Sequence, residues 1–410
     1  MIQKVVVLLV SGFATTLLTS MCCQGAEIDA DWSARASYWT RDKLMPAVSN
    51  ATSLTAWSRG TVSFGEPVSV KWEAWGSEEP MHGDNRSSGE IRKAYLAINN
   101  DTLKLRIGRQ LELWGRADKL NPTDNLSARD YRLLRIEDED QRLGVTMAKA
   151  ETTLSENMTI SGYWIPEFRA SRFPFELVSP SINHPIDWEA DQYAIRLDSS
   201  GGRVDWSLSY YSGFDHSPDY ILESTGVKAA YHKIRVIGAD LAGTAGGFGY
   251  RLEGAYTSTE FDRILQPLIR RPDVWVVAGI DSNYSETWYT NVQYSFRQVL
   301  EDGIGGCSGC VLIAPLVHVN EAFRFQEQNT QHGLSATLRW TSPDKNFRTE
   351  LMTLRYLAPQ QGLVRATIIY KPSDLVTLSL QAQSFYGEKG TYFETVQPTS
   401  GVGMEVKVGF

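Results

Sequence analysis

The chain has 410 residues, of which 42% are hydrophobic, 11% aromatic and 21% charged, and its formal net charge is -8. This composition excludes a disordered chain, because ample apolar and aromatic material is available for burial. The acidic balance argues against a general nucleic-acid binder. The sequence has no run of about 18 apolar residues after residue 20, which excludes a polytopic helical membrane protein.

The N-terminal segment, residues 1–26, has the features of a secretory signal peptide. Lys4 precedes an apolar stretch, and small residues precede a cleavage point near Ala26. Because such segments are removed during export, we expect the remainder of the chain to form the mature protein. A membrane anchor, or a lipoprotein signal at Cys22 or Cys23, is the alternative.

Residues 27–410 are expected to form one β-barrel, because apolar and polar residues alternate in segments of 8 to 12 residues. Segments of about 9 to 11 residues can cross a bilayer as tilted strands. Strands in lipid have to close into a barrel, since an open edge would leave backbone groups without partners. The sequence therefore predicts an all-β fold, a single antiparallel transmembrane barrel. A soluble β-sandwich or propeller is the alternative, but no 40-residue repeat is visible.

The connections between these segments alternate between long and short. Residues 77–90 form a long connection and residues 99–101 a tight turn, and the same holds for residues 165–188 and 198–202. Bacterial barrels have short periplasmic turns and long outer loops, which predicts two periplasmic termini and an even number of strands. A literal count gives 19, with a conflict between residues 273 and 331. We predict about 18 strands, with 16 or 20 as alternatives.

Residues 108–142 form the least repetitive segment, too long for a turn and too polar for a strand. A long charged loop in a large barrel often folds inward, where paired basic and acidic groups sort solutes by charge. A rigid loop outside the barrel is the alternative. We predict a constriction of the lumen with these candidate residues: Arg109, Arg116, Asp118, Asp124, Arg129, Asp130 and Arg132.

The same segment carries a recognisable order of short motifs. Gly-Arg-Gln at residues 108–110 is followed by Trp114 and Gly115 and then by an Asn-Pro-x-Asp turn from Asn121 to Asp124. About 25 residues of this pattern resemble outer-membrane channels of the alginate-export and related porin-like groups. The resemblance implies a channel and does not name the solute.

Basic residues recur on the polar faces of the predicted strands, and their acidic companions there are fewer. A basic lumen favours anionic solutes. Ladders in which each arginine pairs with Glu, Gln or carbonyl groups are the alternative. The predicted lumen-wall residues are Arg106, Arg235, Arg251, Arg297, Arg324, Arg339 and Arg365.

The chain offers few motifs for redox, metal or catalytic chemistry. Cys307 and Cys310 are close enough for a small disulfide in an oxidising compartment, and we expect them to staple a loop. The acidic run Glu137–Asp140 could bind Ca²⁺, but the EF-hand spacing is absent and a solvated patch is favoured. No HExxH, nucleophile elbow, P-loop or dinucleotide motif is present, so no cofactor is predicted.

The last ten residues alternate between apolar and other residues and end on Phe410. They resemble the C-terminal insertion signal of bacterial outer-membrane barrels. The resemblance implies contact with the barrel-assembly machinery, the lipid bilayer and lipopolysaccharide. A surface strand that ends by chance in Phe is the alternative.

Together these features predict a passive porin-like channel of the bacterial outer membrane, not an enzyme. Its solute is expected to be hydrophilic and anionic, small or polymeric, and its oligomeric state is left open. One alternative is a lipid-modifying enzyme, for which His232 beside Ile234 and Val236 is the candidate residue. The other is an export component that requires partner proteins.

Overall fold

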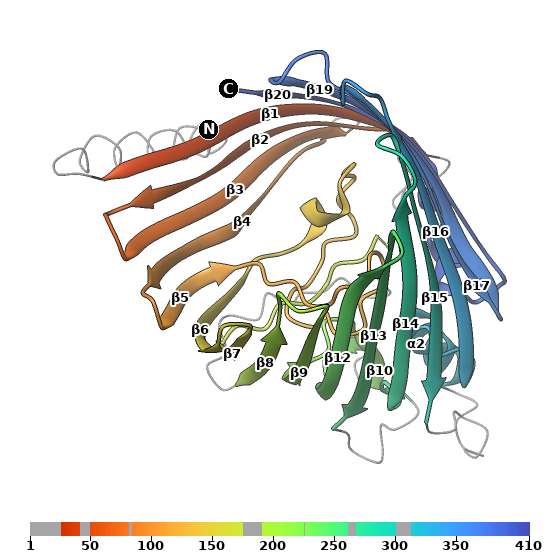
Figure 1. Ribbon diagram of the computed structural model, residues 1–410. Helices are drawn as coiled ribbons and strands as arrows, with labels where there is room; N and C mark the ends of the chain where they lie inside the picture. The colour runs from red at the N-terminus through yellow and green to blue at the C-terminus, as the bar shows by residue number, and fades with distance from the viewer. Residues whose placement is uncertain are drawn as a thin grey trace.

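The computed structural model describes residues 26–41, 50–81, 84–174, 191–224, 226–260, 268–300 and 313–410. Its main element is an 18-stranded antiparallel sheet that closes on itself where β1 (Glu27–Arg41) pairs with β20 (Gly401–Gly409). In Figure 1 the first and last strands, β1 and β20, accordingly lie side by side. Closure gives every strand two neighbours, so no backbone edge is left open. The prediction of a single antiparallel barrel of about 18 strands is confirmed.

Eighteen strands form the wall. Besides β1 and β20 they are β2 (Asn50–Ser63), β3 (Val68–Met81), β4 (Asp84–Asn99), β5 (Leu103–Gln110), β6 (Val145–Ser155), β7 (Met158–Ile165), β8 (Gln192–Ser199), β9 (Val204–Phe214), β12 (Lys233–Ala245), β13 (Phe248–Thr259), β14 (Asp273–Asn283), β15 (Trp288–Val299), β16 (Thr330–Thr341), β17 (Phe347–Leu357), β18 (Gln360–Tyr370) and β19 (Val376–Gly387).

The elements outside the wall belong to the connections. They are the hairpin β10 (Asp219–Glu223) and β11 (Gly226–Ala230), the helices α2 (Ala314–Arg324) and α3 (Tyr392–Val396), and the 3-10 turns η1 (Asp138–Gln141) and η5 (Gln397–Thr399). In the part of the chain that the structure describes, no helix is both long and apolar enough to cross a bilayer.

The connections differ between the two ends of the barrel. Eight short turns lie at the end where β1 begins and β20 ends, and the opposite end carries the connections with β10, β11, α2 and α3. The difficulty in counting strands between residues 273 and 331 is explained by α2. Its apolar residues form a helix that starts with a proline in the first turn, so this stretch adds no strand.

The two faces of the wall differ in polarity as the alternation predicts. On β15, Val292 and Tyr294 face outward and are more than 40% exposed, whereas Gln293 between them is fully buried. Polar wall residues are buried because chain inside the barrel packs against them. The lumen of this barrel is therefore partly filled.

The chain enters the lumen after β5, and the last residues of this strand include a position that requires glycine, Gly108. Gly108 has φ +128°, and a Cβ added there would collide with the backbone carbonyl of Ala94 on β4. Left-handed backbone and close approach each disfavour a side chain at this position.

We expect Gly108→Ala to lower the free energy of unfolding by about 1–3 kcal/mol. The urea midpoint of the refolded barrel, followed by its heat-modifiable gel migration, measures this effect. Gly76→Ala on β3 is the matched control, since an added Cβ there has nothing within 4 Å. Equal losses in the two variants would contradict the packing argument.

Candidate functional site

Residues 111–144, which connect β5 to β6, lie inside the barrel and are called the inner segment below. Asp140 of this segment pairs with Arg35 on β1 at 2.5 Å, and Arg116 pairs with Asp240 on β12. Because β12 is the tenth of the 18 wall strands, β1 and β12 lie on opposite sides of the ring. The inner segment thus crosses the lumen, and Figure 1 shows its trace inside the wall.

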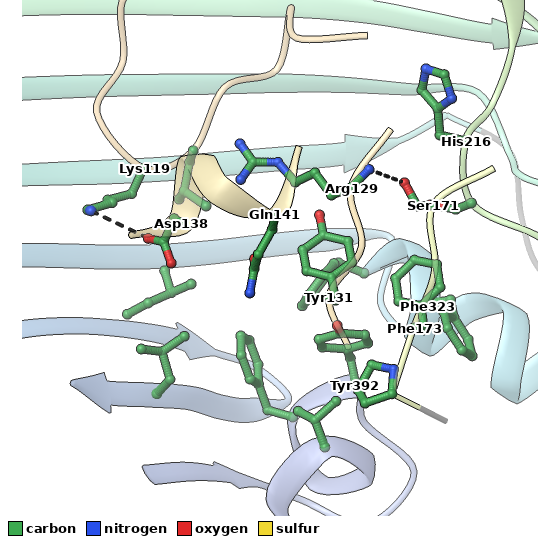
Figure 2. Close-up of a pocket in the computed structure, with 18 of the residues that line it drawn as sticks. Lys119, Arg129, Tyr131, Asp138, Gln141, Ser171, Phe173, His216, Phe323 and Tyr392 are labelled. Carbon is green, nitrogen blue, oxygen red and sulfur yellow. Dashed lines mark hydrogen bonds and ion pairs between the residues drawn. The ribbon is translucent and has the colours of Figure 1, made fainter. Parts of the chain in front are cut away.

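The far end of the inner segment is held by ion pairs and by aromatic rings. Asp138 pairs with Arg365 on β18 at 2.6 Å and with Lys119 at 3.7 Å (Figure 2). Burial disfavours the charged carboxyl, but Arg365 and Lys119 outweigh it and hold the pKa of Asp138 below its usual value. The guanidinium of Arg135 lies over the Trp75 ring of β3, with 4.8 Å to the centroid.

The near end of the inner segment is held by one carboxylate of the wall. Glu253 on β13 is 0% exposed and accepts hydrogen bonds from the backbone N–H groups of Arg116, Ala117 and Thr123 at 2.9–3.0 Å. The Thr123 hydroxyl donates a fourth bond at 2.8 Å. Gly115 permits the approach, since it has φ +93° and a Cβ there would meet the carboxylate. A buried charge is stable only when it is bonded in this way.

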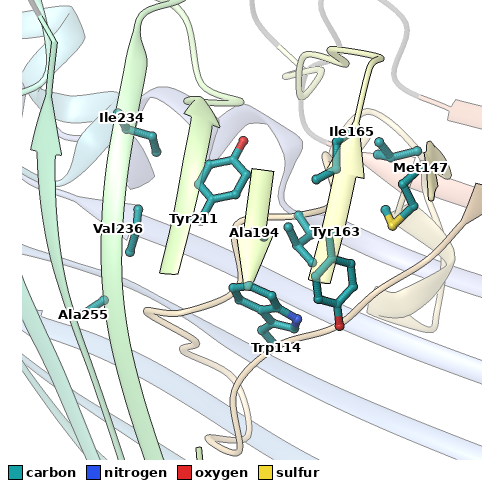
Figure 3. Packing of buried hydrophobic residues seen from close by; sticks show 11 residues of the cluster. Trp114, Met147, Tyr163, Ile165, Ala194, Tyr211, Ile234, Val236 and Ala255 are labelled. Carbon is teal, nitrogen blue, oxygen red and sulfur yellow. The ribbon is translucent and has the colours of Figure 1, made fainter. Parts of the chain in front are cut away.

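An apolar cluster joins the inner segment to the wall between β6 and β13. Trp114 packs edge-on against Tyr163 of β7 with ring centroids 5.5 Å apart. Figure 3 shows Trp114 facing side chains that project inward from neighbouring strands. The cluster comprises Trp114, Leu126, Val145, Met147, Tyr163, Ile165, Ala194, Tyr211, Ile234, Val236 and Ala255. A hydrophobic core therefore lies inside the barrel at this side.

The connections at the end opposite the termini are fastened to one another by α2. The Asn320 amide donates to the carbonyls of Tyr220 and Leu268 and accepts from the Tyr220 N–H. Arg324 pairs with Asp219, which also bonds His232 at 2.7 Å. Three connections that are far apart in sequence thus form one packed unit.

A cavity of about 470 Å³ remains beside the inner segment. Of the described residues that line it, seven are Lys or Arg and three are Asp. Figure 2 shows Lys119 on one side and the rings of Tyr131, Phe173, Phe323 and Tyr392 gathered on another. The cavity thus has a basic part and an aromatic part, and its size is in the range of small-molecule sites.

His216 ties three parts of the chain together at this cavity. Its Nδ1 lies 2.6 Å from the Arg169 carbonyl and its Nε2 lies 3.0 Å from the Asn125 carbonyl of the inner segment. The ring also stacks on Phe168 with an interplanar angle of 4°.

The structure distributes the predicted constriction residues over three locations. Arg109 belongs to the wall, one residue before the end of β5, and pairs with Glu167 at 2.8 Å. Arg116 and Asp118 lie at the start of the inner segment, near β12 to β15. The remaining four lie farther along the segment, where Asp124 pairs with Arg142 and Asp130 with Arg132, and where Arg129 lines the cavity.

Five of the predicted wall arginines are on the inward face of their strands, and each has an acidic partner. The pairs and distances are Arg106–Glu112 at 3.5 Å, Arg251–Asp281 at 3.1 Å, Arg297–Asp273 at 3.2 Å, Arg339–Glu350 at 2.8 Å and Arg365–Asp138 at 2.6 Å.

Two predicted wall positions are wrong. Arg235 is on the outward face of β12, 56% exposed at its side chain, and pairs with Glu260. Its neighbours Ile234 and Val236 point inward because they belong to the apolar cluster around Trp114, which reverses the usual polarity here. Arg324 ends helix α2 and is not on a strand.

Three further predicted features remain: the cysteine pair with the N-terminal segment, the C-terminal phenylalanine and the acidic run. Cys307, Cys310 and residues 1–25 are outside the described residues. Phe410 exchanges backbone hydrogen bonds with Trp32 of β1 at 3.0 and 3.3 Å. The acidic run has its carboxylates in ion pairs with arginines, and among the described residues no three metal-ligating side chains are grouped to hold an ion.

Sequence reasoning missed Glu253 as an anchor and Trp75 as a partner of the inner segment. Glu253 stood out only as an acid on the polar face of a strand. Its partners are more than 120 positions away, a contact that strand periodicity does not reveal. The available signal was that Trp75 lies between Glu73 and Ser77 on the polar, inward face of its strand, where a tryptophan is unusual.

Comparison with known proteins identifies the fold. A family model described as "Protein of unknown function (DUF1302)" matches residues 61–265. No curated protein matches the sequence. Among solved structures, Acinetobacter baumannii OccAB3 is similar with TM-score 0.57 and 11% identity, covering 94% of this chain and 99% of that one. Pseudomonas aeruginosa OpdK, solved with vanillate, gives TM-score 0.57 and 10% identity, covering 94% and 98%. These likenesses establish the fold of outer-membrane channel barrels.

Proposed function

Since the chain belongs to the family described as "Protein of unknown function (DUF1302)", we propose a function from the barrel itself: a passive, porin-like channel of the bacterial outer membrane. In this proposal the signal peptide is removed on export and the end with the short turns and both termini is periplasmic. Lipid, lipopolysaccharide and the barrel-assembly machinery are the expected surroundings. The solute diffuses down its gradient, and the protein contributes the path.

The inner segment carries this proposal. It crosses the lumen and leaves a cavity of about 470 Å³ at its side. An 18-stranded barrel is wide enough for an aqueous channel, so an inward segment with charged residues is a suitable device for narrowing it. Arg116, Arg129 and their partners then form the constriction.

The charge of the cavity supports a preference for anions. Its lining carries more Lys and Arg than Asp among the described residues. Charge of one sign in a narrow, weakly screened space raises the local concentration of the opposite ion. Arg297 and Arg365, which are paired wall arginines, also line the cavity and contribute less, because their partners neutralise them.

A lipid-modifying enzyme is the weaker candidate. His232 bonds Asp219 in the interior ion cluster with Arg324, and Ile234 and Val236 beside it point into the barrel. An enzyme that acts on membrane lipid needs its nucleophile and base at the lipid surface. A channel for export that depends on envelope partners is compatible with the same lumen.

Planar-bilayer recording of the refolded mature chain under a KCl gradient tests the proposal. We expect stable single-channel steps and a reversal potential that shows chloride preference. The double variant Lys119→Gln and Arg129→Gln should lower the chloride-to-potassium permeability ratio by about twofold or more. Lys228→Gln is the control, because the side chain of this β11 residue is exposed and does not line the cavity. A folded wild-type barrel without steps would refute the channel.

A further inference from the structure

A cation and an aromatic ring lie side by side in the cavity. Arg129 and Tyr131 are two residues apart in an extended stretch, whose backbone pairs with Arg142 on one side and Arg172 on the other. Residues two apart in extended chain project to the same side. Both side chains line the cavity, as Figure 2 shows.

The cations of the cavity differ in how closely they are paired. Arg270, Arg297 and Arg365 have a carboxylate oxygen at 2.9, 3.2 and 2.6 Å. Arg129 reaches Glu139 only at 4.0 Å, and Lys119 reaches Asp138 only at 3.7 Å. Both distances exceed those of a charge-assisted hydrogen bond. These two side chains therefore retain donors for an anionic group in the cavity.

The aromatic part is built as a chain of packed rings. Tyr131 stacks on Phe173 with centroids 5.2 Å apart, and Phe173 meets Phe323 of α2 edge-on at 5.0 Å. Phe323 in turn contacts Tyr392 of α3. Phe173 and Phe323 are buried, whereas Tyr131 is 39% exposed. The rings behind Tyr131 fix its orientation, and its second face is turned away from Phe173.

Resting on the proposed channel function, we propose that the cavity is a transient binding site for organic anions with an aromatic body. Arg129 and Lys119 bind the anionic group, and Tyr131 stacks on the ring. An anionic solute without a ring meets only the cations, and an uncharged ring meets only Tyr131. A solute with both features makes both contacts at once, so it dwells longer in the pore than either simpler solute.

Current block in single-channel recordings measures this dwell. The probes are benzoate, benzamide with the same ring and no charge, and acetate with the charge and no ring. In the wild type, benzoate should block at a concentration about tenfold lower than either other probe. Tyr131→Ala should weaken block by benzoate about threefold to tenfold and leave block by acetate unchanged.

Two further variants separate the roles of the residues. Tyr131→Phe keeps the ring, so benzoate should block this variant at the same concentration as the wild type. This variant controls for a folding defect caused by substitution at residue 131. Arg129→Gln should weaken block by benzoate and acetate alike, by about tenfold. Tyr284→Ala, in an exposed short turn, is the matched control and should change nothing.

The outcomes distinguish this inference from the function on which it rests. A conducting pore in which benzoate, benzamide and acetate block equally overturns the binding site and leaves the channel standing. Benzoate block that is unaffected by Tyr131→Ala overturns the role of the ring. A folded barrel without conductance refutes the channel itself.

Discussion

A barrel in which a short Gly-Ser turn replaces residues 111–144 is expected to conduct about threefold or more above the wild type. The replacement is geometrically simple, because Gln110 and Val145 already face each other across β5 and β6. Without the inner segment the lumen loses its bridge between β1 and β12 and the loops lose one side of the cavity. Chloride preference should fall at the same time. Single-channel recording measures both quantities.

The same Gly-Ser turn placed at residues 284–287 is the control, since those residues already form a short turn between β14 and β15. Its conductance should equal that of the wild type. Heat-modifiable migration of both variants shows whether the barrel has formed. Unchanged conductance in a folded barrel lacking the inner segment would show that ions take another route.

Glu253→Ala is expected to release the near end of the inner segment. The substitution removes the acceptor of four hydrogen bonds and leaves three backbone N–H groups unpaired. Loss of a buried, bonded carboxylate costs about 3–5 kcal/mol. We expect a lower urea midpoint and frequent jumps to a larger conductance. Glu253→Gln retains one carbonyl acceptor and should be intermediate.

Glu350→Gln is the matched control for this series. Glu350 is also an inward carboxylate of the wall, but it pairs with Arg339 of the neighbouring strand. Its loss should change stability by less and leave the conductance steady. If the conductance of Glu253→Ala were as steady as that of Glu350→Gln, the role of Glu253 as an anchor would be contradicted, because the other contacts would hold the inner segment alone.

The fold was predictable because a barrel in lipid has one simple rule for each strand. Apolar residues that face outward alternate with polar residues that face the lumen, as Leu252 and Glu253 do on β13. The closing pair β1–β20 follows from the alternation at both ends of the chain. Short turns alternate with long connections because successive connections lie at opposite ends of the barrel, and one end has short turns and the other long loops.

The interior was less predictable because it is built from contacts between distant residues. Ile234 and Val236 face inward only because Trp114, more than 100 positions earlier, supplies an apolar partner. That packing turned Arg235 outward, against expectation. The strand count was in conflict between residues 273 and 331, and helix α2 lies within that stretch. The alternation of apolar and polar residues predicts which face of a wall strand is inward, and packing against the inner segment reverses that alternation locally.

Exclusion of neutral polymers tests the central claim most directly. Single-channel conductance is recorded with polyethylene glycols of increasing size, in the wild type and in the barrel with residues 111–144 replaced. If the inner segment forms the constriction, the smallest polymer excluded from the wild type should enter the shortened variant. The same size limit in both proteins would contradict the account, because the narrowest point would then lie elsewhere in the barrel.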